Sequence, residues 1–168
     1  MMKLAIFLSI MLLSACSNLG TTRVTNGINI LAIEDPEIFD TISWVDIFDY
    51  QTLANKKTKS AELAFQEANY DDIPKNGFII VRLATSTIKS ANTKFWRIVI
   101  KNKNGNVVAQ ETGPNKVANF RRTSDITPWV NSFLVLLPEL EYPYEVYIIS
   151  DILDKRWGFK VLGKQDGI

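Results

Sequence analysis

The sequence predicts a mainly β protein, an antiparallel β-sandwich of the immunoglobulin-like or C2-like kind, with one accessory helix around residues 58–69. The later part of the chain carries roughly seven or eight short β-branched or aromatic segments, separated by turn residues. Clear helical periodicity is confined to one stretch. With 46% apolar residues the chain can build a core without disulfides. A small closed barrel is the alternative, because the number of strands does not separate the two architectures.

The first elements of the domain fall between residues 28 and 50. Residues 28–33 are mostly apolar and predict a short strand. Asp35 and Pro36 are typical of a helix start, with aspartate as the N-cap and proline in the first helical position. Residues 42–50 alternate in the manner of a strand. We therefore expect a short helical turn followed by a strand.

The accessory helix is predicted from the segment TKSAELAFQEANYDD, residues 58–72. Leu63, Phe65 and neighbouring alanines form one apolar stripe, and alanine, glutamate and glutamine favour helix. Thr58 or Ser60 can cap its start. We expect the helix to end before Pro74.

Strand patterns follow in quick succession after Gly77. Asn104-Gly105 lies between two of them and is the strongest short-range signal for a hairpin. The segment FLVLL, residues 133–137, is apolar on both faces, which predicts a central strand. The alternating segment KRWGFKV, residues 155–161, predicts a strand nearer an edge or an open face. The expected strands are 78–86, 94–102, and those in KVANFRR, WVNSFLVLL, YEVYIIS and RWGFKVL.

The first residues have the form of an export signal. Lys3 is followed by an apolar run from Leu4 to Leu13, which is too short to span a bilayer. Leu13-Ser14-Ala15-Cys16 resembles the lipobox of bacterial lipoprotein precursors, and Cys16 is the only cysteine of the chain. The resemblance implies transfer of diacylglycerol to the Cys16 thiol, cleavage before Cys16 and acylation of the new amino terminus. Two or three acyl chains form a stable anchor.

This resemblance divides the chain into three parts. Residues 1–15 are the expected signal peptide, residues 16–27 the lipidated cysteine with a flexible tether, and residues 28–168 a single β-sandwich domain. The expected membrane contact is the lipid at Cys16. Ser17 follows it, where lipoproteins of this class retained at the inner membrane often have aspartate. A cell-envelope location therefore follows, with the outer membrane favoured and the periplasmic or surface face left open.

The residue inventory argues against an enzyme. The chain has no histidine, which removes the common triads, the usual zinc sites and the commonest base near neutral pH. Its one cysteine is assigned to the anchor, and no glycine-rich phosphate loop is present. We predict no catalytic residue, no metal and no cofactor. Basic and acidic side chains balance once Lys3 is removed, so nucleic acid is not an expected partner.

Carboxylates do cluster early in the domain. They suggest either a calcium site or a glycosidase-like pair, but the DxDxDG spacing of a calcium loop is absent. A helix cap and solvated faces explain them more simply. The residues are Glu34, Asp35, Glu37, Asp40, Asp46 and Asp49.

Aromatic rows are the candidate partner-binding residues. Trp157 and Phe159 share a face of one expected strand, and Tyr142 and Tyr144 share a face of another. Core packing is the simpler interpretation, but a row that faced solvent would offer an aromatic platform for a peptide or a glycan. Arg121-Arg122 could pair with the carboxylates or phosphates of a partner, or guard an edge strand.

Three functions are consistent with these observations. The favoured hypothesis is a lipid-anchored envelope lipoprotein whose β-sandwich binds a protein or glycan partner without catalysis. The second is a structural accessory subunit of an envelope transport or secretion complex. The third is a carboxylate-based hydrolase of envelope polysaccharide, which needs two carboxylates about 5–10 Å apart across a cleft.

Overall fold

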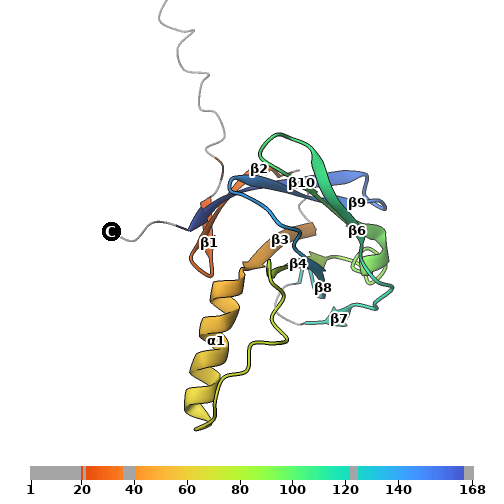
Figure 1. Ribbon diagram of the computed structural model, residues 1–168. Coiled ribbons are helices and arrows are strands. Elements are labelled where there is room, and N and C mark those ends of the chain that lie inside the picture. The colour runs from red at the N-terminus through yellow and green to blue at the C-terminus, as the bar shows by residue number, and fades with distance from the viewer. Residues whose placement is uncertain (1–19, 21, 36–40, 122–124, 165–168) are drawn as a thin grey trace, which may run out of the picture.

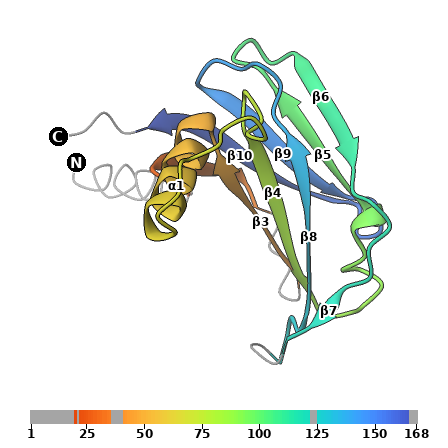
Figure 2. The same ribbon diagram turned by 60° about the horizontal axis from the view of Figure 1, so that its bottom comes forward.

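The protein folds into two antiparallel β-sheets that face one another, with one helix projecting from them (Figures 1 and 2). The computed structural model describes residue 20 and residues 22–35, 41–121 and 125–164. Sheet A has six strands in the order β1-β2-β10-β9-β5-β6, and sheet B has four in the order β3-β4-β8-β7. The predicted mainly β, antiparallel sandwich is therefore confirmed. The strands are β1 (Thr22–Thr25), β2 (Ile28–Glu34), β3 (Thr41–Phe48), β4 (Phe78–Thr85), β5 (Trp96–Lys101), β6 (Val107–Thr112), β7 (Asn119–Phe120), β8 (Trp129–Leu136), β9 (Tyr144–Ser150) and β10 (Lys155–Lys164).

The core lies between the two sheets, because every second side chain of each central strand points inward. Trp96 and Trp157 meet at its centre with ring centroids 5.3 Å apart. The indole of Trp96 donates a hydrogen bond of 2.7 Å to the carbonyl of Ser90, so its one polar group is satisfied inside the core. The branched residues around the two indoles are Ile28, Ile30, Val45, Ile47, Ile79, Val81, Leu83, Ile98, Ile100, Val135, Val146, Ile148 and Val161.

Two predictions about strand position are each correct in part, because β10 has the predicted open face and β8 has the predicted interior position in its sheet. β10 lies between β2 and β9 and is not an edge strand. Its alternation reflects a sheet with one buried face and one open face. β8 pairs with β4 along its whole length, but its own apolar pattern is not buried on both sides. Leu134 and Leu136 are about half exposed, whereas Phe133 and Val135 face the core.

The helix α1 spans Tyr50–Leu63, so the predicted range of 58–69 is correct only in its first residues. Asp49 is the N-cap, and its carboxylate accepts a hydrogen bond of 2.8 Å from the backbone N–H of Thr52. This cap starts the helix at Tyr50, where the alternating pattern had predicted strand. The preceding strand β3 ends at Phe48. The short η1 turn (Thr93–Phe95) precedes β5. The helical start predicted at Asp35-Pro36 falls largely on residues 36–40, outside the described residues.

The boundary predicted between tether and domain is also corrected. β1 (Thr22–Thr25) pairs with β2 through an Asn26-Gly27 turn, so these residues belong to sheet A and not to a tether. The predicted signal peptide of residues 1–15 and the predicted lipidation site Cys16 lie outside the described residues. Within the described part of the chain, no helix is sufficiently long and apolar to cross a membrane.

Candidate functional site

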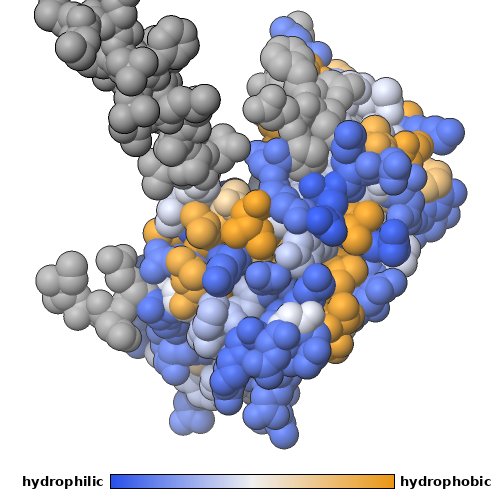
Figure 3. Space-filling view, turned by 90° about the horizontal axis from the view of Figure 1, so that it is seen from above, coloured by the Kyte–Doolittle hydropathy of each residue, from blue (hydrophilic) through white to orange (hydrophobic). Residues whose placement is uncertain are grey.

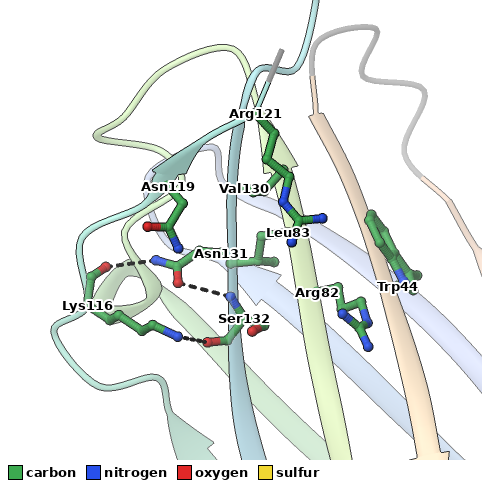
Figure 4. Close-up of a pocket in the computed structure, with 9 residues that line it drawn as sticks. All are labelled: Trp44, Arg82, Leu83, Lys116, Asn119, Arg121, Val130, Asn131 and Ser132. Atoms are coloured by element: carbon green, nitrogen blue, oxygen red, sulfur yellow. Dashed lines mark hydrogen bonds between the residues drawn. The ribbon is translucent and has the colours of Figure 1, made fainter. Parts of the chain in front are cut away.

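A pocket of about 110 Å³ opens on the outer face of sheet B (Figure 4). The register of three strands brings the residues at the base of the pocket together. Trp44 of β3 pairs with Arg82 of β4, and Arg82 pairs with Ser132 of β8. Their neighbours Val45, Val81 and Phe133 fill the core, so these three side chains must point outward. One row across three strands thus brings together an indole, a guanidinium and a hydroxyl.

Asp46 holds one side of this pocket in place. It is a nearly buried carboxylate next to Trp44 in sequence, and it forms an ion pair with Arg82. Arg23 of β1 lies 3.5 Å from the same carboxylate and 6.0 Å from the centre of the Trp44 ring. The hydroxyl of Thr25 also reaches Asp46, at 3.4 Å. The indole is therefore flanked by two arginines that share one acid.

Asn131 fixes the opposite wall. Its buried amide donates hydrogen bonds to the carbonyls of Lys116, at 2.8 Å, and Ala91, at 2.9 Å. Its side-chain oxygen accepts a bond from the N–H of Ser132, and the Lys116 ammonium donates one to the carbonyl of Ser132 (Figure 4). These bonds hold the segment between β6 and β7 against β8. The strand β7 is only two residues long, so it leaves this part of the β8 edge without a paired strand among the residues described. Asn119 and Arg121 then extend the wall.

The pocket carries an excess of positive charge. Arg82, Lys116 and Arg121 line it, with Arg23 at its rim, and Asp46 pairs with Arg82 and Arg23 only. The exposed Arg121 has no ion-pair partner among the residues that the structure describes. Guanidinium groups bind carboxylates and phosphates in a fork geometry, and an indole face receives apolar groups. This arrangement suits an anionic group next to an apolar one.

Apolar rows flank the pocket on both sides. Ile42, Ala84 and Val130 form the neighbouring row toward the β7 end. Toward α1, Ile80 pairs with Leu134. Beyond them Phe48, Phe78 and Leu136 form a third apolar row, which borders the helix. The opposite side of the molecule, seen from above in Figure 3, shows mainly hydrophilic residues with apolar ones in separate groups.

Of the four aromatic residues predicted to bind a partner, three pack into or against the core and Tyr142 is exposed. Trp157 is only 2% exposed and Tyr144 only 3%, while Phe159 is partly buried against the same core. Tyr142 is exposed and stacks on Tyr144 with ring centroids 5.5 Å apart. Trp157 and Tyr144 therefore offer no exposed ring, whereas Tyr142 remains accessible. The two tyrosines do border an open hollow that also includes Asp49, whose carboxylate is engaged by Lys164 at 2.8 Å.

The clustered carboxylates are dispersed among basic partners. Glu34 pairs with Arg156, Asp46 with Arg82 and Asp49 with Lys164. Glu37 and Asp40 lie outside the described residues. No group of three or more potential metal ligands occurs in the described ranges.

Sequence reasoning did not single out Trp44, Arg82 or Lys116 as site residues. A signal was present in β3, where Ile42, Trp44 and Phe48 share the face opposite the buried Val45 and Ile47. A sheet with one face in solvent normally carries polar residues there, so an apolar outer row is unusual. Comparison with protein-family models, curated proteins and solved structures finds no match to this chain.

Proposed function

We propose that this protein is a lipid-anchored lipoprotein of the cell envelope whose β-sandwich binds an acidic segment of a partner protein. The observation that carries the proposal is the Trp44 pocket on the outer face of sheet B, whose lining combines an indole with Arg82, Lys116 and Arg121. The site acts by binding and carries out no chemistry. The lipobox residues Leu13–Cys16 support the anchor.

The surroundings of the pocket favour a protein over a glycan. A glycan needs one stacking ring and hydrogen-bonding groups, and it gains little from branched apolar side chains. Here exposed Ile42 and Leu134 lie in the rows on either side of Trp44. A peptide that places a carboxylate on Arg121 can cover these residues with its own apolar side chains.

Peptide binding to the purified full chain tests this proposal. The probe is a short peptide with two glutamates beside a phenylalanine, compared with the same peptide carrying lysines and with an acidic oligosaccharide. We expect the acidic peptide to bind, with Kd raised at least tenfold by Trp44→Ala or Arg121→Glu. Lys155→Glu on sheet A is the matched charge control and should leave Kd unchanged.

Three results would contradict the proposal. Equal affinity for acidic and basic peptides would show that the cations do not select the ligand. Equal effects of Arg121→Glu and Lys155→Glu would show that net charge and not the pocket matters. Binding of the oligosaccharide alone would replace the protein partner with a glycan.

The lipid anchor is tested separately. Cys16→Ala should abolish labelling by a radioactive fatty acid and leave an uncleaved or mislocalised chain, because Cys16 is the only thiol available. Continued labelling and membrane fractionation of this variant would refute the anchor.

A further inference from the structure

The helix α1 and the segment that returns from it form an arm that projects from the body of the sandwich below sheet B (Figures 1 and 2). The helix has 14 residues and therefore a length of about 21 Å, yet none of its residues is buried. Contacts within the arm hold it together. Thr58 shares a hydrogen bond of 2.9 Å with the Tyr70 hydroxyl, and Lys57 pairs with Asp72.

The tip of the arm presents a phenylalanine in a costly conformation. The N–H of Phe65 bonds to the carbonyl of Glu62, and the N–H of Gln66 bonds to that of Ala61. These two bonds form a Schellman motif with Phe65 at the position that glycine normally occupies. Phe65 has φ +54° and is 98% exposed, next to Leu63 at 75%. A large apolar side chain is thus held in solvent at a site where it lowers stability.

The tip is also acidic. Residues 62–71 contain Glu62, Glu67 and Asp71 and no lysine or arginine, and Asp72 beyond them is paired with Lys57. An anionic bilayer surface would repel such a tip. An apolar pocket with basic side chains around it would attract the tip. The Trp44 pocket of this same chain has that composition, with an indole, Arg82, Lys116 and Arg121.

We propose that a second copy of this chain is a partner of the Trp44 pocket, with the Phe65 tip of one copy docking beside Trp44 of the other. This inference rests on the proposed function of the pocket and names its occupant. Phe65 packs against the indole and the flanking apolar rows, and Glu62 and Glu67 face Arg121 and Lys116 of the neighbouring copy.

The positions of arm and pocket allow both contacts to form at once. α1 leaves sheet B beside Phe48, at one end of the sheet, and β7 lies at the other end (Figure 2). The pocket extends from the Trp44–Arg82–Ser132 row in the middle of the strands to Asn119 of β7. A two-fold axis between two facing copies therefore places each arm over the pocket of its partner, and the association closes as a dimer. Two small contacts predict a weak dimer, which anchoring in one membrane would favour by raising the local concentration.

Sedimentation equilibrium of the purified full chain in density-matched detergent tests the inference, from about 10 μM to about 1 mM. We expect a reversible dimer that is weakened at least tenfold by Phe65→Ala and by Arg121→Glu. Lys155→Glu should leave it unchanged. An equimolar mixture of the Phe65→Ala and Arg121→Glu chains keeps one intact contact per mixed dimer, so association should partly return.

Phe65→Gly separates folding from association. Glycine relieves the positive φ, so Tm should rise by about 2–4 °C, the shift expected for about 1 kcal/mol in a chain of this size. Its dimer should nevertheless weaken at least tenfold. A chain that stays monomeric at about 1 mM, or a dimer unaffected by both single variants, would overturn the inference. If such a chain still bound the acidic peptide at Trp44, the proposed function would stand without the dimer.

Discussion

Trp157→Ala is the most direct test of the core that the structure assigns to this chain. Trp157 is almost fully buried and packs on Trp96 with ring centroids 5.3 Å apart. A buried tryptophan removes about 200 Å² from water, which at about 25 cal/mol per Å² gives about 5 kcal/mol as an upper estimate. Because alanine keeps part of that burial and the cavity relaxes partly, we expect the free energy of unfolding to fall by about 4 kcal/mol.

Urea denaturation followed by far-ultraviolet circular dichroism measures this loss without relying on indole fluorescence. Trp44→Ala is the matched control, since it removes the same side chain from the open face of sheet B. It should cost about 1 kcal/mol or less while removing binding at the pocket. If Trp157→Ala cost no more than Trp44→Ala, Trp157 would not be a core residue, and the surface platform suggested by the sequence would be restored.

Three further predictions concern sheet A and the α1 cap. Gly158→Ala should lower the free energy of unfolding by about 2–3 kcal/mol, more than Gly105→Ala, because its Cβ would lie 3.0 Å from the Tyr147 ring. Gly105→Ala, in open space at φ +80°, should cost about 1 kcal/mol, and equal effects would contradict the crowding. Burial raises the pKa of Asp49, but hydrogen bonds from Lys164 and Thr52 outweigh it, so the net pKa lies below its ordinary value. The ionised Asp49 therefore stabilises the fold fully at pH above its ordinary pKa, and this stabilisation is lost as the pH falls through the folded-state pKa. In Asp49→Asn, Tm should consequently depend less on pH in the acid range, as thermal melts would measure. Burial, with a hydrogen bond to a neighbouring glutamate, raises the pKa of Tyr147 to about 12 from 10.0. Stability should therefore fall between those pH values, and Tyr147→Phe should lose this dependence in alkaline melts.

Local patterns were sufficient to predict most strands. The segment after Gly77 is β-branched between turn signals, and β4 (Phe78–Thr85) lies within the predicted range. Asn104-Gly105 joins β5 to β6 as predicted, with Gly105 at positive φ. These features depend on neighbours along the chain, so the sequence carries them directly.

The helix shows where local patterns fail. The apolar stripe through Leu63 and Phe65 predicted an amphipathic helix, but a stripe does not specify which surface, if any, will cover it. The structure leaves both side chains exposed at the tip. The Asp49 cap then moved the helix start by about two turns relative to the prediction.

The candidate site could not be predicted because its residues meet only through strand register. Trp44, Arg82 and Ser132 come from β3, β4 and β8, and no local spacing relates them. The aromatic rows that were chosen instead have the same alternation whether they face solvent or the core. Trp157 and Tyr144 are buried because the opposing sheet covers them. The position of that sheet is not encoded in the sequence of either strand.

Side chains from β1 and the turn after it protect the β3 edge of sheet B against the addition of another strand. The outer face of sheet B has no such protection from these residues. The Asn26 amide donates a hydrogen bond of 2.8 Å to the Ile47 carbonyl on the free side of β3. Thr25 and Arg23 hold Asp46 on the same strand. Such contacts prevent another strand from adding to β3. Side chains close this edge, while the outer face exposes Ile42, Leu134 and Leu136 and leaves Trp44 partly exposed. A partner of sheet B is therefore expected to meet the face by side-chain packing and ion pairing and not by adding a strand at β3.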